Sequence, residues 1–215
     1  MRAGTAHFAA GCLFLSMTAV GDAMSETVNF DSYSPGALPP LWVCGVTGSG
    51  ASRWTVEPAA DAPSKPNVVK QSGVGDYPWC ALKAASMTDG YVEVRFKSLS
   101  GRSDQAGGVM WRWKDGNNYY IARANALENN VSLYYTINGR RNTIKYVDAP
   151  VPKNTWHTLR VDFAGTSIKV SLNGKTYIDV QDKRITGAGA VGMWTKADSV
   201  TAFDDFAYGA AAPLK

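Results

Sequence analysis

The chain has 215 residues, 19% of them charged, and a formal net charge of +4 at pH 7. Aromatic residues make up 11% of the sequence and glycine occurs 21 times, but only four of the 18 acidic residues are Glu. A chain so short of helix formers and so rich in strand and turn formers is not a coiled coil, a helical bundle or a disordered tail. Its charge is too small for a nucleic-acid-binding protein, and no stretch has the roughly 18 consecutive apolar residues of a membrane-spanning helix.

Residues 1–23 have the pattern of a secretory signal peptide. A single Arg precedes an apolar run that is too short to span a bilayer, and the small residues Gly21 and Ala23 stand where a signal peptidase requires them. The alternative is a lipoprotein box at Cys12, but the most hydrophobic part of the segment follows that cysteine. We therefore predict cleavage after Ala23, export to the periplasm or the extracellular space, and one domain over residues 24–215.

Export would leave Cys44 and Cys80 as an even pair of cysteines in an oxidising compartment, where disulfides form and persist. We predict a Cys44–Cys80 disulfide, with two separate buried thiols as the alternative. The same cleavage leaves His157 as the one histidine of the mature chain. A zinc site with two histidines from one chain is therefore excluded.

Alternating apolar and polar residues predict half-buried strands along much of the chain. Val92, Val94 and Phe96 alternate with charged residues, and the same period of two occurs over residues 159–163 and 168–172. Turn dipeptides that tolerate positive φ lie beside such strands, at Asp115-Gly116, Asn138-Gly139 and Asn173-Gly174. Strands at intervals of about ten residues, with almost no helical periodicity, predict an all-β fold built as a two-sheet antiparallel sandwich.

A candidate ligand-binding face comes from the hairpin over residues 107–130. If its strands alternate strictly, Arg112 on the first strand and Tyr119, Arg123 and Asn125 on the return strand point away from the core together. Guanidinium and amide groups beside an aromatic ring suit sugars, because hydroxyl groups need fork-like donors and the apolar face of a sugar stacks on an aromatic ring. The alternative is that the arginines are only solvated surface.

A second dense stretch, residues 192–206, adds to this face if its strand belongs to the same sheet. Trp194, Lys196 and Asp198 share one parity there, so an aromatic ring and a cation would join the polar side chains of the hairpin. The predicted ligand-binding residues are therefore Arg112, Tyr119, Arg123, Asn125, Trp194 and Lys196.

Five motifs between residues 107 and 206 carry a resemblance to a known family. They are Gly-Gly-Val-Met-Trp-Arg at 107–112, Asn-Tyr-Tyr at 118–120, Asn-Thr-Trp-His-Thr-Leu-Arg-Val at 154–161, Val-Gly-Met-Trp-Thr-Lys-Ala-Asp-Ser at 191–199 and Phe-Asp-Asp-Phe at 203–206. With these motifs the chain resembles the concanavalin A-like lectin/glucanase superfamily over residues 27–209. More closely, it resembles exported bacterial members labelled laminin-G-like or glycoside-hydrolase-like. The resemblance implies a jelly roll of two curved antiparallel sheets whose concave face forms the ligand groove.

The same superfamily contains lectins, glycosidases, lyases and adhesion modules, and catalytic motifs distinguish them. Laminarinase-like members carry Glu-x-Asp-x-(x)-Glu, which places a nucleophile and an acid on one strand face. None of the four Glu residues here is followed two positions later by Asp, and the motifs of jelly-roll alginate lyases are not recognisable. A different carboxylate pair, Glu128 with Asp115 or Asp198, stays open.

Many superfamily members hold a structural calcium ion where the first and last strands meet. The resemblance places its ligands at Asp31, Asp204 and Asp205, whose hard oxygen atoms suit calcium. Addition of calcium followed by EDTA should then shift the melting temperature.

We expect an exported, lectin-like carbohydrate-binding domain that is not catalytic. It would hold an anionic or heavily hydroxylated glycan across its concave face, with no cofactor other than this calcium ion. The alternatives are a glycoside hydrolase with a non-standard carboxylate pair, and an envelope interaction protein without a glycan ligand.

Overall fold

The computed structural model describes residues 25–38 and 40–210, together with Met1. The predicted signal peptide and its cleavage site lie outside the described residues. The described part of the chain contains fifteen β-strands and no α-helix. It therefore contains no helix long and apolar enough to cross a membrane.

The strands are β1 (Ser25–Val28), β2 (Trp42–Ala51), β3 (Trp54–Pro58), β4 (Asn67–Gln71), β5 (Val74–Met87), β6 (Gly90–Ser100), β7 (Ala106–Asp115), β8 (Asn118–Asn125), β9 (Asn130–Ile137), β10 (Arg140–Asp148), β11 (His157–Ala164), β12 (Ser167–Leu172), β13 (Lys175–Gln181), β14 (Gly189–Trp194) and β15 (Val200–Gly209).

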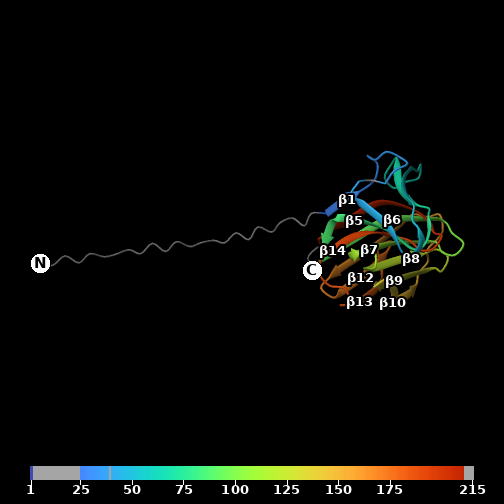
Figure 1. Cartoon of the computed structure of the whole chain (residues 1–215). Coiled ribbons are helices and arrows are strands. Elements are labelled where there is room, and N and C mark those ends of the chain that lie inside the picture. Colours follow the sequence, from blue (N-terminus) through green and yellow to red (C-terminus); the bar gives the residue numbers. More distant parts are fainter. Residues whose placement is uncertain (2–24, 39, 211–215) are drawn as a thin grey trace.

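Two antiparallel sheets form the sandwich (Figure 1). Sheet A has eight strands, in the order β13-β12-β11-β6-β15-β4-β3 with β1 beside β15, and sheet B has seven, in the order β10-β9-β8-β7-β14-β5-β2. Strands that are distant in the sequence become neighbours, since β15 lies between β4 and β6 and β14 lies between β5 and β7. The predicted all-β, two-sheet antiparallel sandwich is confirmed.

Two of the predicted turn dipeptides, Asn138-Gly139 and Asn173-Gly174, connect the strands of hairpins, whereas the third hairpin turns one residue later than predicted, at Gly116 and Asn117. Asn138 and Asn173 each have a positive φ of 51° and stand at the β9–β10 and β12–β13 turns. At the third turn Asp115 pairs with Asn118, so only two residues connect β7 to β8. Asn and Gly adopt positive φ more readily than other residues, and these short loops therefore set the register of the paired strands.

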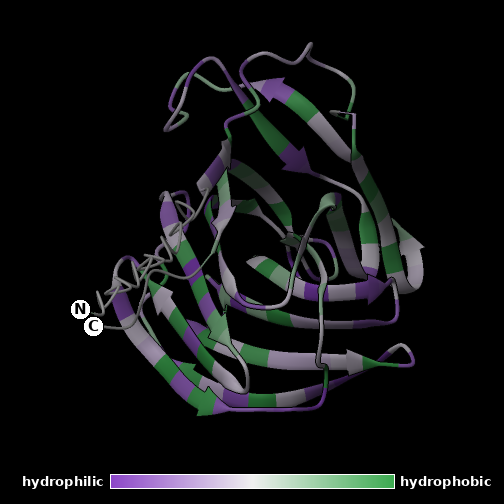
Figure 2. Ribbon diagram, turned by 90° about the vertical axis from the view of Figure 1, so that its left-hand side faces the viewer, coloured by the Kyte–Doolittle hydropathy of each residue, from purple (hydrophilic) through white to green (hydrophobic). Residues whose placement is uncertain are grey.

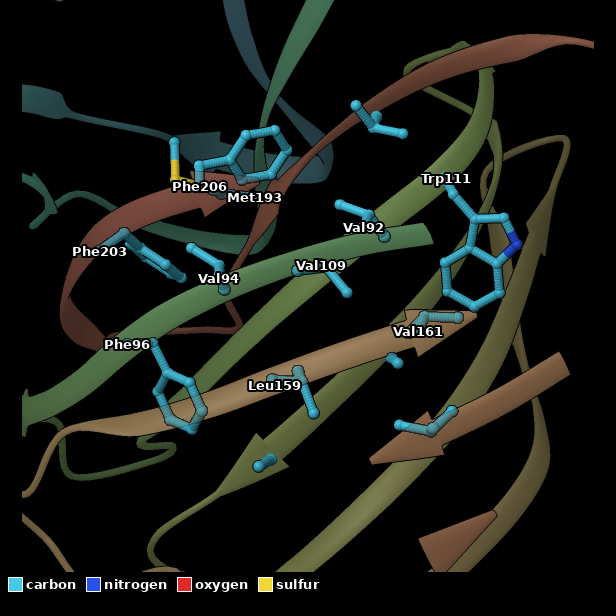
Figure 3. Close-up of a cluster of buried hydrophobic side chains, with 14 of the residues drawn as sticks. Val92, Val94, Phe96, Val109, Trp111, Leu159, Val161, Met193, Phe203 and Phe206 are labelled. Carbon is cyan, nitrogen blue, oxygen red and sulfur yellow. The ribbon is translucent and has the colours of Figure 1, made fainter. Parts of the chain in front are cut away.

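The core lies between the sheets and collects the apolar side chains of the alternating strands (Figure 3). Val92, Val94 and Phe96 of β6 are fully buried, as are Leu159 and Val161 of the neighbouring β11. Figure 2 shows the resulting alternation of hydrophobic and hydrophilic positions along the strands. Burial of each such side chain stabilises the folded state by about 1.5–3 kcal/mol, which favours turning the more apolar face of a strand inward. The face predicted from the two-residue period is the face that these strands bury.

A disulfide bond joins Cys44 to Cys80, as predicted. The two residues lie directly opposite each other on β2 and β5, with their Cα atoms 4.0 Å apart. Because β2 is the last strand in the order of sheet B, the bond fastens an edge strand to its neighbour.

Candidate functional site

The outer face of sheet B, turned away from the sandwich core, carries a second buried cluster. It includes Trp79, Trp113, Tyr134 and Trp194, each at most 9% exposed. The outer face of an antiparallel sheet is usually open to water. Something in sheet B must therefore cover these large rings and keep water from them.

Arg141 of β10 shows that the sheet is strongly curved. Its guanidinium carbon lies 4.3 Å from the ring centre of Tyr134, 5.8 Å from that of Trp194 and 4.6 Å from that of Tyr77 on β5. β10 and β5 are first and sixth in the order of sheet B, and a flat sheet would hold them about 24 Å apart. One Arg and one Tyr side chain cannot span that distance, so this face of sheet B is concave.

We call Tyr77, Tyr134, Trp194 and the Arg141 guanidinium among them the aromatic box. The rings of Tyr77 and Trp194 are stacked, with centres 5.8 Å apart and planes at 15°. Arg141 Nη1 is buried and has no hydrogen-bond partner among the described residues. A buried donor without an acceptor costs about 1–3 kcal/mol, so the box presents a cation that an additional acceptor would stabilise.

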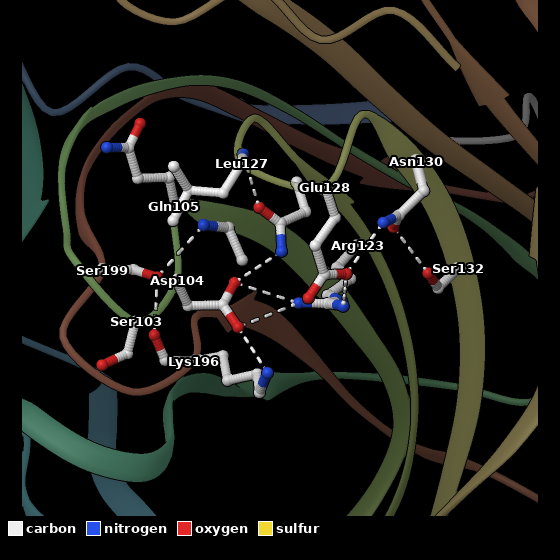
Figure 4. Close-up of polar contacts among 12 residues, drawn as sticks. Ser103, Asp104, Gln105, Arg123, Leu127, Glu128, Asn130, Ser132, Lys196 and Ser199 are labelled. Carbon is white, nitrogen blue, oxygen red and sulfur yellow. Dashed lines mark hydrogen bonds and ion pairs between the residues drawn. The ribbon is translucent and has the colours of Figure 1, made fainter. Parts of the chain in front are cut away.

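A charged network lies on the same face (Figure 4). The fully buried carboxylate of Asp104 accepts hydrogen bonds from Arg123 Nη1 at 3.0 Å and from Asn125 Nδ2 at 2.7 Å. It also pairs with Lys196 Nζ at 2.5 Å, while Arg123 Nη2 donates to Glu128 Oε2 at 2.7 Å. We call Asp104, Arg123, Asn125, Glu128 and Lys196 the Asp104 network.

Glu128 stays ionised within this network. Partial burial raises the pKa of its carboxyl, but the hydrogen bond from Asn130 and the charges of Arg123 and Lys196 together hold that pKa below its ordinary value. The pKa of the neighbouring Tyr146 is raised by burial and by the negative charge of Glu128. Glu128 can therefore accept hydrogen bonds as a carboxylate, while the two cations beside it donate hydrogen bonds and make it a weaker base than a free Glu.

Most of the predicted ligand-binding residues come together on this concave face. Arg123, Asn125 and Lys196 belong to the Asp104 network, and Trp194 belongs to the aromatic box. The Arg123 guanidinium lies 5.6 Å from the ring centre of Tyr134, so the network and the box are in contact. The condition that residue 194 shares a sheet with the hairpin is met, because β14 pairs with β7.

Tyr119 also points to this face, but beneath its surface. The side chain is fully buried, and its hydroxyl group forms a hydrogen bond with that of Thr47 at 2.6 Å. Burial raises the pKa of Tyr119. Tyr119 therefore forms part of the floor under the aromatic box. Neither Tyr119 nor the ring of Trp194, which is also fully buried, offers a surface on which a ligand could stack.

Arg112 does not join the group, because strict alternation fails in β7. Its φ of 47° marks an irregularity in the pairing with β8, and beyond it Trp113 packs in the concave-face cluster, not in the core with Trp111. The Arg112 guanidinium lies 5.7 Å from the ring centre of Phe163 and donates to the backbone oxygen of Ile185 at 3.0 Å. It ties loops to the end of the sandwich instead of lining the concave face.

The two other carboxylates considered as partners of Glu128 hold turns instead. Asp115 accepts hydrogen bonds from the backbone N–H of Asn117 at 2.7 Å and from Asn118 Nδ2 at 2.9 Å. Asp198 accepts the backbone N–H groups of residues 102–104. Burial raises the pKa of Asp198, but these hydrogen bonds outweigh it and hold the pKa below its ordinary value. Asp198 therefore positions the loop that carries Asp104, the residue at the centre of the Asp104 network.

Sequence reasoning missed Asp104, Tyr77, Tyr134 and Arg141. A local signal existed for Tyr134, because it has the parity that places a β9 side chain on the same face as Arg123 of the adjacent β8. The other three come from a loop and from two strands that are not adjacent in sheet B. No local pattern brings them together.

The acidic residues predicted to hold calcium are engaged with backbone amides. Asp31 Oδ1 accepts the N–H of Asn67 at 3.0 Å, and Asp204 accepts those of Ser64 at 2.8 Å and Asp205 at 2.7 Å. Over residues 25–38 and 40–210, no three Asp, Glu, His or Cys side chains are grouped so that they could hold a metal ion. These side chains do not fit calcium as they stand, and calcium binding stays a prediction of the resemblance.

Asp204 should make the stability of the protein depend on pH. Burial, together with the nearby Asp205 and Asp31, raises the pKa of its carboxyl to about 7. Because the carboxyl of Asp204 binds its proton more tightly in the folded state, protonation stabilises the fold. This contribution to the free energy of unfolding is complete below about pH 4, the pKa of an unfolded Asp, and is lost as the pH rises to about 7. We expect Asp204→Asn, which stays neutral, to gain stability relative to the unsubstituted protein over this range.

Urea denaturation at about pH 4 and about pH 8, with and without EDTA, measures this difference and tests calcium at the same time. Glu57→Gln is the control of opposite sign. Partial burial raises the pKa of Glu57, but its bonds to Lys70 and Thr55 hold it below the ordinary value, so the variant should lose relative stability as the pH rises. If Asp204→Asn shows the same stability difference at both pH values, the raised pKa is wrong.

A family model described as the 3-keto-alpha-glucoside-1,2-lyase-like domain matches residues 46–206, most of the chain. The chain belongs to this family. The matched part of this 3-keto-alpha-glucoside-1,2-lyase-like domain includes the whole aromatic box and the whole Asp104 network. A search of curated proteins found no match.

Solved structures that resemble this lyase-like domain share its fold. Carbohydrate binding module CBM66 from Bacillus subtilis is 21% identical, with a TM-score of 0.63, and the match covers 77% of this chain and 93% of that one. Bacillus licheniformis beta-glucanase is 15% identical, with a TM-score of 0.59, and the match covers 90% of this chain and 100% of that one. The cellulose induced protein Cip1 is 14% identical, with a TM-score of 0.62, and the match covers 89% of this chain and 100% of that one. At these identities the likeness shows the fold alone, and it confirms the predicted concanavalin A-like jelly roll.

Proposed function

We propose that this domain binds a carbohydrate on the concave face of sheet B. The observation that carries the proposal is the contact between the aromatic box and the Asp104 network. It brings four accessible side chains together on the concave face, Tyr77, Arg141, Glu128 and Lys196, above the buried rings of Tyr134 and Trp194. Tyr77 is the partly exposed ring of the box and can stack on the C–H face of a sugar. The charged groups form strong hydrogen bonds to the sugar hydroxyls. The likeness to a carbohydrate-binding module and to a beta-glucanase supports the proposal.

The ligand that fits best carries a carboxylate, as a uronic acid does. Arg123, Arg141 and Lys196 bring three positive charges to the concave face, whereas Asp104 and Glu128 bring two negative ones. Both carboxylates are already paired, and Arg141 is paired with neither of them. A ligand carboxylate would neutralise the excess charge and supply the acceptor that Arg141 Nη1 lacks among the described residues.

We propose that the domain acts after export, and the N-terminal pattern and the disulfide support this location. Residues 1–23 have the features of a signal peptide. The Cys44–Cys80 bond supports export, because disulfides persist in oxidising compartments and are rare in the cytosol. The domain therefore meets its glycan in the periplasm or outside the cell.

A second candidate is cleavage of a 3-keto glycoside, which family membership favours. In a 1,2-elimination a base removes the proton at C2, the electrons of that C–H bond form the C1=C2 double bond, and the glycosidic oxygen leaves C1 and takes a proton from water. Ionised, exposed Glu128 is the candidate base. Of its two cationic neighbours Arg123 is buried and paired on both terminal nitrogens, so the partly exposed Lys196 is the candidate donor that stabilises negative charge on the keto oxygen. Hydrolysis by a carboxylate pair fits less well, because Asp104 is buried between those two cations.

Arg141→Gln should weaken the binding of an acidic oligosaccharide by about 10- to 100-fold. The reason is that a hydrogen bond to a charged group contributes about 1.5–3 kcal/mol. A glycan array identifies uronate-containing ligands, and titration calorimetry measures their affinity. Arg140→Gln is the matched control, because Arg140 is the exposed neighbour of Arg141 on β10 and should change the affinity by no more than about twofold.

Product analysis of the incubated ligands, with methyl 3-keto-α-glucoside included, separates recognition from cleavage. Binding without products supports the carbohydrate-binding proposal. Release of methanol together with a keto sugar that carries a C1=C2 double bond supports the lyase candidate, whereas methanol together with the saturated keto sugar indicates hydrolysis. Equal losses for Arg140→Gln and Arg141→Gln would show that the aromatic box does not hold the acidic group. A protein that binds no glycan on the array contradicts the proposal and favours an interaction protein without a glycan ligand.

A further inference from the structure

A cleft of about 200 Å³ lies on the outer face of sheet A, on the opposite side of the sandwich from the aromatic box. Apolar side chains of three strands form its floor: Val68 of β4, Leu99 of β6 and Ala202 of β15. Ala202 stands directly between Lys70 and Lys97 in the sheet. Because its side chain is short, it leaves a hollow between two long neighbours.

The indole ring of Trp156 contributes a wall to this cleft. Its Nε1 donates to the backbone oxygen of Asp61 at 2.8 Å, which fixes the polar edge of the ring against the loop before β4. Lys97 Nζ lies 5.9 Å from the ring centre. The ring is only half-buried, so an aromatic surface is held in a defined orientation beside the hollow, as stacking on a sugar requires.

Two ion pairs flank the hollow, Lys70 with Glu57 and Lys97 with Asp61. The hydrogen bond from Lys97 lowers the pKa of Asp61, which therefore keeps its charge at neutral pH. The positive and negative charges are equal in number, unlike those on the concave face. A sugar hydroxyl can donate to a carboxylate and accept from an ammonium group at the same time. The cleft thus offers paired donors and acceptors without attracting a net charge.

We propose that this cleft is a second sugar-binding site, which takes one neutral hexopyranose ring stacked on Trp156 between Lys70 and Lys97. The volume is below the roughly 300–1,000 Å³ of cavities for drug-sized ligands, so the site holds a single ring of a glycan. It does not depend on the ligand of the concave face. Two sites on opposite sheets let one domain hold two glycan segments, which raises its avidity for a polysaccharide.

The indole N–H of Trp156 provides a direct test. The full chain is labelled with ¹⁵N and titrated with methyl glucoside, methyl galactoside and methyl mannoside, and the resonances of the seven tryptophan indoles are followed. Trp156→Phe assigns the Trp156 resonance by removing it. We expect a saturable shift of this resonance with at least one glycoside. The resonance of Trp113, which faces the concave side of sheet B, is the internal control and should not move.

Variants separate this site from the concave face. Lys97→Met keeps the apolar stem beside the ring and removes the ammonium group, and it should weaken binding by about tenfold. The backbone amide resonances of Leu99 and Ala202, which line the cleft, should also shift when the glycoside binds, and Trp156→Ala should abolish these shifts. The remaining amide resonances of this variant show whether it keeps its fold. Arg141→Gln, on the concave face of sheet B, should not change the affinity of this cleft for the glycoside.

Absence of a saturable Trp156 shift with all three glycosides overturns the proposal. A shift of Trp194 in its place overturns it too, since the neutral sugar would then occupy the concave face. The proposal is also overturned if both Lys97→Met and Trp156→Ala bind the glycoside with the affinity of the unsubstituted protein.

Discussion

Replacing Asp104 with Ala should lower the free energy of unfolding by about 3 kcal/mol. Asp104 is fully buried, and Arg123, Asn125 and Lys196 all direct donors at its carboxylate. Removal of one partner from a buried ion pair costs about 3–5 kcal/mol, because the remaining charge stays buried without compensation. The lower end of this range applies, since Arg123 keeps Glu128 as a partner and the side chain of Lys196 is 26% exposed and can turn to water.

Two further variants show whether the buried charge is the cause. Asp104→Asn keeps the shape of the side chain and removes its charge, so it should lose most of the same free energy. Asp115→Ala removes an exposed carboxylate that bonds within its own hairpin turn, and it should cost about 1 kcal/mol or less. Urea denaturation measures all three. Equal effects of Asp104→Ala and Asp115→Ala would mean that the Asp104 network does not stabilise the fold.

The fold could be predicted because the face of a strand is decided locally. Successive side chains point to opposite sides, and burial stabilises whichever face is more apolar. This is why Val94 and Val161 pack inward while Arg123 and Asn125 face outward as the alternation indicates. The same logic placed Trp194 on the correct face once β14 was found beside β7.

The site was predicted only in part, because its remaining contacts are not local. Arg112 breaks the alternation of β7 and bonds instead to carbonyl oxygens of loops that are distant in the sequence. Arg141 meets Tyr77 only because sheet B curves, and a one-strand pattern does not specify the curvature of a whole sheet. Asp104 lies in a loop held by Asp198, nearly a hundred residues later. In each case the partner comes from the topology rather than from neighbouring residues.

Reduction of the Cys44–Cys80 bond should have the largest effect on stability, a loss of about 4 kcal/mol. The bond closes a loop with a sequence separation of 36, and in the chain-entropy model a loop of this length restricts the unfolded chain by about that amount. For a domain of this size the melting temperature should fall by roughly 8–16 °C. Calorimetric melts with and without dithiothreitol measure the fall, and thiol titration of the unfolded protein verifies the redox state.

The loss should also reach the concave face, because β2 supports it. Gly45, next to Cys44, lies so close to Trp79 that a Cβ added there would stand 2.6 Å from the indole ring. An edge strand that is no longer fastened to β5 should let water reach this ring, and the tryptophan fluorescence of the reduced protein should shift to the red below its melting temperature. Cys44→Ala/Cys80→Ala is the control, since its melting temperature should match that of the reduced protein and should not respond to dithiothreitol. A reduced protein with two titratable thiols that melts within about 2 °C of the oxidised one would show that the bond does not stabilise the fold.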